Sequence, residues 1–164
     1  MEAEDWDAIT GIYESIAAEG QWIGGELPID WERRRPLWEA TWSDPRWLVL
    51  LAVVDGSPVG WVSAEHQPNG RVELGMGIVE GHRSMGIGTL LLAAVVGWAG
   101  HRGAHKVTLE VWPHNERARG LYTKFGFVVE GHHPRHWRRS DGSLWDSLTM
   151  GLVLDDAAPG GPGS

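Results

Sequence analysis

The chain has 164 residues, a net charge of −8, 11 tryptophans and no cysteine. That length suits one domain with a single core, and the lack of thiols excludes disulfide bonds, thiolate metal sites and a cysteine nucleophile. The longest apolar run, residues 90–96, is far shorter than the roughly 20 residues of a membrane span, and the acidic N-terminus does not resemble a signal peptide. We therefore expect a cytoplasmic protein that binds neither membranes nor nucleic acid.

The negative charge is concentrated in the first quarter of the chain. Residues 1–45 hold eleven acidic and three basic side chains, whereas the remainder holds eleven of each. Such a field repels nucleic acid and attracts a cationic partner or substrate. For most of these carboxylates the solvated faces of two helices are the better explanation, and a cationic partner or substrate stays open as the alternative.

The first half of the chain predicts two helices followed by three strands. Apolar residues recur at helical spacing over residues 5–19, and Gly20 then ends the helix. Asp30 is a suitable N-cap for a second helix over residues 31–42, which Pro36 would kink or divide. Apolar and alternating runs separated by hairpin-type turns predict strands over residues 46–54, 58–66 and 71–79.

The second half alternates helices with strands. Helices are expected over residues 86–100 and 115–125, strands over 105–112 and 126–133, and a final hairpin around 140–142. An antiparallel meander that leads into strand–helix–strand units predicts a mixed α/β sheet with helices packed on it. We expect residues 1–154 to form one domain and residues 155–164, which lack large apolar side chains, to be a disordered tail.

Several familiar site motifs nearly match and fail. Gly75, Gly77 and Gly81 have the wrong spacing for a dinucleotide fingerprint and lie within a strand. Ser84 has the wrong neighbours for a nucleophile elbow, and no lysine followed by serine or threonine completes a nucleoside-triphosphate P-loop. Surface and packing roles account for the eight histidines better than metal ligation does, so we expect no metal site.

Two glycines mark the start of the third helix. Gly86 and Gly88 stand there although a glycine inside a helix costs roughly 1 kcal/mol relative to alanine. Either they merely soften a core helix, or they let backbone N–H groups at the helix N-terminus approach an anion, with Arg83 adding a charged fork. The arrangement suits a diphosphate, but two glycines alone leave both alternatives open.

A second constellation spans the fourth predicted helix. Asn115 is a suitable N-cap, and Tyr122 lies about two helical turns further along the same face. A tyrosine on such a face is either half-buried core or an acid catalyst, and the core role is the more common one.

Together these two segments resemble the GNAT superfamily of N-acetyltransferases. Arg83-x-x-Gly86-x-Gly88 is similar to its Q/R-x-x-G-x-G/A signature, and "NERARGLYTKFGF" at residues 115–127 resembles its N-x-x-A-x-x-L-Y-x-K-x-G-F signature. The resemblance is strong over residues 71–154 and loose over the N-terminal helices. Members usually begin with a strand, but only residues 1–4 precede the first helix here, so that strand is expected to be short or missing.

The resemblance implies a GNAT-like fold, in which a central, mostly antiparallel sheet contains one splayed parallel strand pair and is flanked by about four helices. The splayed strands would be residues 73–79 and 106–112, and Gly75 and Gly77 would ease a bulge in the first of them.

The resemblance also implies acetyl-coenzyme A as cosubstrate, with its diphosphate on the amides of residues 83–89 and its pantetheine arm along the first splayed strand. The implied cofactor-binding residues are Ile78, Val79, Arg83, Ser84, Met85, Gly86, Ile87, Gly88, Thr89, Asn115, Ala118 and Tyr122.

The implied reaction is direct attack of a free amine on the thioester in a ternary complex, since no cysteine is available to carry the acetyl group. A backbone N–H of Ile78 or Val79 would stabilise the oxyanion, and Tyr122 matches the general acid of the family. Glu73 and Glu110, one on each splayed strand, are candidate bases, and a structural role stays open for each.

The acceptor site is implied to lie against the first two helices and their loop. Trp22, Glu26, Asp30 and Trp31 are the candidate substrate-binding residues, because aromatic faces beside carboxylates suit a cation with an apolar body. We therefore expect a primary amine of a small molecule or a peptide, and the sequence leaves a homodimer open. Two other functions are considered, a non-catalytic acyl-CoA sensor and a nucleotide-binding oxidoreductase, and the failed dinucleotide fingerprint disfavours the second.

Overall fold

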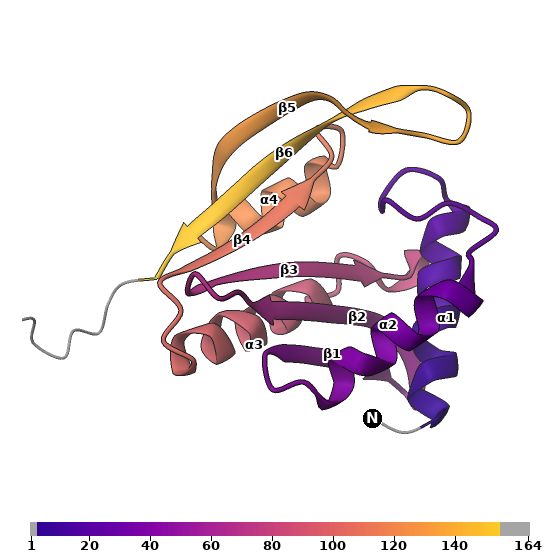
Figure 1. Cartoon of the computed structure of the whole chain (residues 1–164), viewed down its shortest axis with the longest axis horizontal. Coiled ribbons are helices and arrows are strands. Elements are labelled where there is room, and N and C mark those ends of the chain that lie inside the picture. The colour runs from indigo at the N-terminus through magenta and orange to yellow at the C-terminus, as the bar shows by residue number, and fades with distance from the viewer. Residues whose placement is uncertain (1–2, 155–164) are drawn as a thin grey trace, which may run out of the picture.

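The structure is a computed structural model that describes residues 3–154. Its central element is one six-stranded sheet (Figure 1). The strand order is β1-β2-β3-β4-β6-β5, and every neighbouring pair is antiparallel except β3 and β4, which are parallel. In chain order the elements are α1 (Ala3–Ala18), α2 (Trp31–Ser43), β1 (Trp47–Val54), β2 (Ser57–His66), β3 (Arg71–Ile78), the short 3₁₀ helix η1 (Glu80–His82), α3 (Ile87–His101), β4 (Lys106–Val111), α4 (Glu116–Lys124), β5 (Val128–Arg138) and β6 (Leu144–Val153). The predicted fold class, a mixed sheet with one parallel pair and four flanking α-helices, is confirmed.

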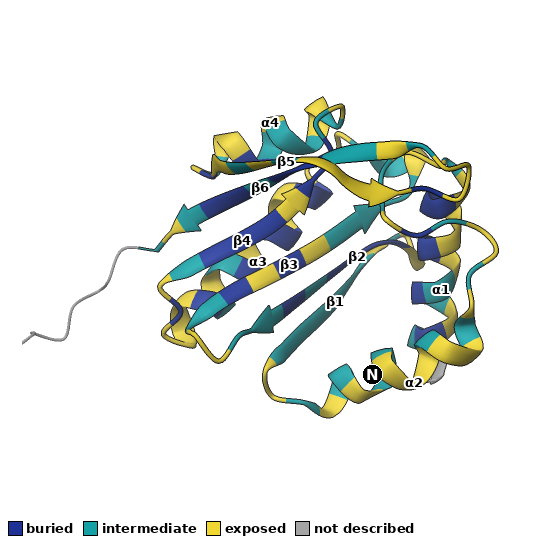
Figure 2. Ribbon diagram, turned by 45° about the horizontal axis from the view of Figure 1, so that its top comes forward, coloured by how far each residue is buried: buried dark blue, intermediate teal, exposed yellow. Residues whose placement is uncertain are grey.

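The two faces of the sheet are covered by different helices. In Figure 1, α3 and α4 lie behind the sheet, and α1 and α2 stand at its right-hand end. Alternate residues of the central strands, among them Val62, Val72 and Val107, are fully buried in the core that α3 and α4 cover. Figure 2 shows this alternation of buried and more exposed residues along β3, whereas three successive residues of β4 are buried. The opposite face therefore belongs to α1 and α2.

The helices α1 and α2 rest on the sheet through aromatic rings. Tyr13 of α1 lies 6.1 Å from Trp61 of β2 and 5.2 Å from Trp38 of α2, measured between ring centroids. No residue of α2 is fully buried, so this helix is held mainly by its partly buried tryptophans. As expected, the Asp30 side chain caps α2 by accepting the Arg33 N–H at 3.0 Å, and the helix runs through Pro36 without dividing.

The parallel pair β3–β4 separates half-way along its length. Pairing runs from Arg71 opposite Lys106 to Leu74 opposite Leu109, and β3 then continues to Ile78 without β4 beside it. The two strands visibly diverge in Figure 1. A gap therefore opens in the middle of the sheet, as the family resemblance implies.

Gly75 and Gly77 have a different role from the one expected. They form no bulge, because β2 and β3 pair in unbroken register along their length. A Cβ on Gly77 would lie 2.7 Å from Ile16 Cδ1, and one on Gly75 would lie 3.7 Å from the Trp61 ring. Gly77 thus allows α1 to lie close against β3, whereas a Cβ on Gly75 would make only an ordinary contact with the indole of Trp61.

The described part of the chain begins at residue 3 and ends at residue 154. The helix α1 begins at Ala3, the first residue that the structure describes, so the expectation that the first strand of the family is short or missing stays a prediction. The predicted tail, residues 155–164, lies outside the described residues. No helix within the described range is long and apolar enough to cross a membrane.

Candidate active site

A cavity of about 750 Å³ occupies the gap between β3 and β4. Its walls come from both strands, the first turn of α3, the helix α4, the loop after α1, and the β5–β6 hairpin. Because the gap breaks the sheet, the cavity is reached from both faces, with α3 and α4 on one side and α1 with its loop on the other. The arrangement suits two ligands that meet at the sheet.

The first turn of α3 presents backbone amides to the cavity. Gly86 caps this helix with φ at +85°, a left-handed conformation that favours glycine. Helix geometry leaves the first N–H groups of α3 without acceptors inside the helix, so they attract an anion. The cavity-lining members of this segment are Ser84, Gly86, Gly88 and Thr89.

Gly88 is required for a reason other than phosphate contact. A Cβ at this position would lie 2.9 Å from Leu121 Cδ2 and 3.4 Å from Ile78 Cδ1. Glycine therefore lets α3 approach β3 and α4 closely. Two other residues of the predicted cradle do not line the cavity: the side chain of Met85 is 63% exposed, and Ile87 is packed in the core.

Arg83 is not the free charged fork that the sequence suggests. Its two terminal guanidinium nitrogens donate hydrogen bonds to the Glu19 carboxylate, and Nη1 lies 2.7 Å from Glu19 Oε2. Its Nε donates to the Ile78 carbonyl at 2.8 Å. Glu19 also accepts from Trp22 Nε1 at 2.6 Å. The hydrogen bonds from Arg83 lower the pKa of the Glu19 carboxyl, although partial burial acts in the opposite direction. The charge of Arg83 is thus neutralised before any ligand arrives.

The open edge of β3 offers one of the two predicted oxyanion donors. Val79 N–H donates to the Val59 carbonyl at 3.0 Å, so it is already used. Hydrogen-bonding direction alternates along an antiparallel strand, so the N–H of Ile78 points away from β2 and into the gap. Ile78 lines the cavity, and Val79 does not. The assignment therefore moves to Ile78 alone.

The α4 segment of the second signature lies as the sequence predicts. The Asn115 side chain caps the helix by accepting the Ala118 N–H at 3.2 Å, and both residues line the cavity with Tyr122. Tyr122 is only 7% exposed, and its ring packs 5.8 Å from that of Phe127. Burial raises the pKa of the Tyr122 phenol to about 12. Its side chain is both core and cavity wall, so the core role is confirmed and the acid-catalyst role stays a prediction.

The two candidate bases are placed differently. Glu110 of β4 lines the cavity, and its carboxylate accepts from Trp137 Nε1. Glu73 does not line the cavity; it lies where β3 and β4 are still paired and forms a 3.5 Å ion pair with Arg71. The gap opens beyond Glu73, which explains why only one of the two carboxylates reaches it.

Of the four predicted acceptor residues, only Trp22 lines the cavity. Glu26 instead accepts from Ser140 N–H at 3.0 Å and thereby fastens the loop to the β5–β6 hairpin. Asp30 is engaged as the N-cap of α2. Trp31 donates to Glu14 and lines a separate groove between α1 and α2.

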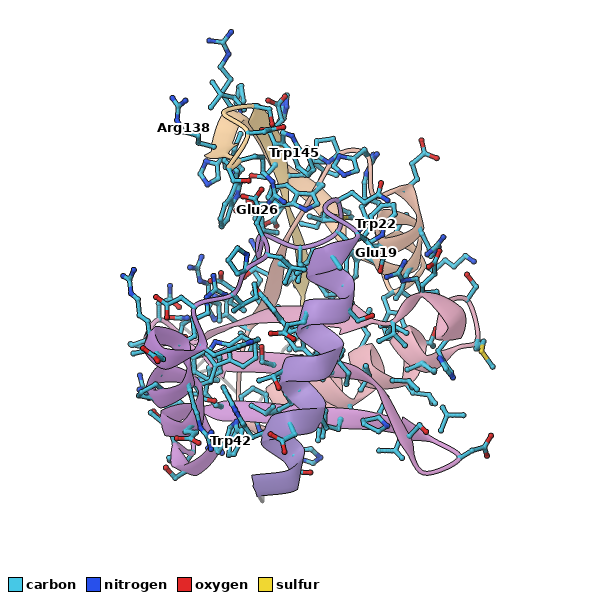
Figure 3. All side chains as sticks on the ribbon, turned by 90° about the vertical axis from the view of Figure 1, so that its right-hand side faces the viewer. Glu19, Trp22, Glu26, Trp42, Arg138 and Trp145 are labelled. Atoms are coloured by element: carbon cyan, nitrogen blue, oxygen red, sulfur yellow. The ribbon has the colours of Figure 1, made fainter. Side chains whose placement is uncertain are left out.

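The cavity wall on the side of α1 and the β5–β6 hairpin is aromatic and comes from distant segments. In Figure 3, Glu19, Trp22, Glu26 and Trp145 lie where the end of α1 and its loop meet the β5–β6 hairpin, and Trp42 lies far from them. No local motif marks these aromatic residues, because strands and helices far apart in sequence bring them together. The ones lining the cavity are Tyr13, Trp22, Trp61, Trp112 and Trp137.

Comparison with known proteins agrees with this geometry. The model of the Acetyltransferase (GNAT) family matches residues 10–127. An L-methionine sulfoximine/L-methionine sulfone acetyltransferase of Pseudomonas paraeruginosa is 26% identical over 157 residues, which cover 92% of this chain and 90% of that protein.

Two solved structures share the fold. Ribosomal-protein-alanine N-acetyltransferase from Brucella melitensis has a TM-score of 0.83 at 26% identity, covering 94% of this chain and 97% of that one. A phosphinothricin acetyltransferase from Sinorhizobium meliloti, in complex with AcCoA, has a TM-score of 0.83 at 20% identity, covering 99% and 90%. Because the family model spans more than half of the sequence, the chain belongs to the GNAT family of acetyltransferases.

Proposed function

We propose that this protein is an acetyl-CoA-dependent N-acetyltransferase that transfers the acetyl group to a primary amine of a small molecule by direct attack. The observation that carries the proposal is the cavity between the separated strands β3 and β4, which joins a helix N-terminus, a free strand edge and Tyr122. The relatives named for acetylating methionine sulfoximine and phosphinothricin support a small amine acceptor.

The cofactor is assigned to the side of α3 and α4. Its diphosphate would rest on the first amides of α3, where the helix dipole favours negative charge. Arg117 and Lys124 of α4 also line the cavity and supply positive charge for phosphates. Arg83 contributes indirectly, since it holds the Ile78 carbonyl and is itself held by Glu19.

The pantetheine arm would lie along β3 beyond Leu74, where β4 no longer pairs. Met76 and Ile78 direct their backbone groups into the gap there, and an extended chain with amides can add to such an edge as a strand does. In this alignment the thioester carbonyl would lie near the Ile78 N–H.

The acyl transfer then needs three groups. The amine nitrogen attacks the thioester carbon, and the charge that develops on the carbonyl oxygen is stabilised by the Ile78 N–H. Glu110 accepts the proton that the amine loses, directly or through a water. As the C–S bond breaks, the thiolate takes a proton from the Tyr122 hydroxyl, which is protonated at neutral pH because its pKa is about 12. The Tyr122 phenolate then regains a proton from water, and Glu110 releases to water the proton that it took from the amine. The products are the N-acetyl amine and free coenzyme A.

The proposal is tested by binding and by turnover. Acetyl-CoA, but not NAD, is expected to raise the melting temperature, because the proposed diphosphate site lacks a dinucleotide fingerprint. Free thiol is expected to accumulate when acetyl-CoA and a panel of primary amines are supplied. Acetyl-CoA binding without thiol release for any amine would identify a sensor, and a shift with NAD alone would overturn the cofactor assignment.

A further inference from the structure

The acceptor side of the cavity differs from the cofactor side in chemistry. It is lined by aromatic rings from five elements or loops, and it faces away from the helices that would hold the phosphates. Resting on the acetyl transfer proposed above, we infer that the acceptor is an amine with an apolar, preferably aromatic, body and without a carboxylate beside the amine.

Aromatic residues line two sides of the cavity where the acceptor would bind. Tyr13, Ile16 and Trp61 form one side of the cavity, where α1 lies on β2 and β3. Trp112 and Trp137 form the other side, with their ring centroids 5.6 Å apart in an edge-to-face contact. Rings of this size favour a ligand that buries apolar surface, and their faces also attract an ammonium group.

The cations at the cavity wall are already engaged or lie on the cofactor side. Of the described residues, three cations line the cavity, namely Arg83, Arg117 and Lys124. Arg83 is already paired with Glu19, in a contact where both side chains are less than a fifth exposed. The other two lie on α4, on the side assigned to the cofactor phosphates. None is left for an acceptor carboxylate.

Two further arginines near the acceptor side are engaged as well. Arg139 is 5% exposed, stacks 4.5 Å over the Trp145 ring and lies 3.5 Å from the Glu26 carboxylate. Arg34 donates to the Tyr13 hydroxyl at 3.1 Å and does not line the cavity. Recruiting either cation for a ligand would require breaking contacts that hold the wall together.

The remaining carboxylate on this side is that of Glu110, with the His136 ring nitrogen 3.7 Å from it. Glu110 reaches the cavity from β4, and its carboxylate is held by Trp137. It attracts an ammonium group and repels a carboxylate attached next to it. An α-amino acid would therefore bring an anion into an aromatic site without a partner, which carries a large desolvation cost.

The inferred acceptor differs from those named for the relative from Pseudomonas paraeruginosa. Methionine sulfoximine and methionine sulfone, named for the relative from Pseudomonas paraeruginosa, are α-amino acids and carry a carboxylate beside the amine. The present chain is expected to prefer the corresponding decarboxylated amines.

Matched pairs of acceptors test the inference. We would compare 2-phenylethylamine with L-phenylalanine, and 3-(methylsulfonyl)propylamine with L-methionine sulfone, by thiol release at saturating acetyl-CoA. In each pair the amine without the carboxylate is expected to have a kcat/KM at least about tenfold higher, which corresponds to one unpaired interaction of about 1.4 kcal/mol. Ethanolamine serves as a small polar control and is expected to be a poorer acceptor than 2-phenylethylamine.

A variant strengthens the test without depending on absolute rates. Glu110→Gln removes the charge that repels a carboxylate, so the preference for 2-phenylethylamine over L-phenylalanine should shrink several-fold even if both rates fall. Equal or better use of the amino acids, or better use of ethanolamine, would overturn the inference and leave the acetyltransferase assignment intact. Absence of thiol release with every amine would instead overturn the proposed function itself.

Discussion

Glu19 and Arg83 are 64 positions apart in the sequence and form a two-pronged ion pair beside the cavity. Glu19 directly follows α1 and also holds Trp22, whereas Arg83 precedes α3 and holds the carbonyl of Ile78. The pair thus connects the loop on the acceptor side with the strand edge on the cofactor side. A substitution at either residue should therefore alter both the acceptor-side loop and the cofactor-side strand edge.

Replacing Glu19 by glutamine is expected to lower the free energy of unfolding by about 2 kcal/mol, the usual scale for a charged hydrogen bond. The KM for acetyl-CoA should rise as well, because Ile78 is no longer held. Urea denaturation and steady-state kinetics measure the two effects. The matched control is Glu39→Gln, whose ion pair with Arg35 is about half-exposed and should contribute less than about 0.5 kcal/mol.

The same pair predicts a dependence on pH. The pKa of Glu19 is below its ordinary value of 4.5, so the stabilisation is complete above that value and is lost as pH falls through the lowered pKa. The stability difference between the wild type and Glu19→Gln should therefore shrink in acid. A difference that stays constant down to pH 3 would contradict the ion pair as its source.

Tyr122→Phe tests the general acid. The change removes only the hydroxyl and keeps the ring against Phe127, so folding and acetyl-CoA affinity should be unaffected. We expect kcat to fall by roughly 100-fold, within the usual range for a positioned acid. Single-turnover thiol release and a melting curve distinguish a catalytic loss from a structural one. An unchanged rate across pH would remove the tyrosine from the mechanism.

The buried phenol also makes a prediction for alkaline solution. Its pKa is about 12 in the folded protein and about 10 when exposed, so the unfolded chain loses this proton first as pH rises. The stability relative to Tyr122→Phe should be constant below pH 10 and fall by about 3 kcal/mol between pH 10 and 12. Denaturant titrations of the two proteins at matched pH values provide the measurement, and a parallel decline would contradict it.

Two glycines of α3 should respond to alanine in opposite directions. Gly86 has a left-handed conformation, so Gly86→Ala is expected to cost about 1 kcal/mol and to weaken acetyl-CoA binding. Gly97 lies within α3 with no atom within 4 Å of an added Cβ, so Gly97→Ala should stabilise the protein by up to about 1 kcal/mol. Thermal denaturation with and without acetyl-CoA compares them; equal effects would show that the Gly86 turn is not strained.

Local features of the sequence predicted local features of the structure well. Asp30 and Asn115 cap their helices as expected, because an N-cap depends only on residues two or three positions away. The strands and the splayed pair follow from apolar patterns and from the family resemblance, and both are present. Tyr122 faces the cavity because its helix and its spacing from Asn115 are fixed by short-range geometry.

Long-range partners account for what the sequence did not predict. Glu26 and Ser140 are 114 positions apart, so nothing near Glu26 indicates that its carboxylate fastens a hairpin instead of meeting a substrate. The same holds for Arg83, which is an apparent phosphate ligand until Glu19 is placed beside it. Gly88 is explained by Leu121, which only the packed structure brings near.

The gap between β3 and β4 divides the site into two halves that can change independently. Substitutions at Tyr13 or Trp137 alter the acceptor wall without contacting the first turn of α3. New amine specificities can thus arise by drift in the α1 loop and the hairpin while the cofactor chemistry is inherited unchanged. Glu19 and Arg83 are the exception, because their ion pair joins the two halves. A substitution at either residue would affect the acceptor wall and the cofactor side together.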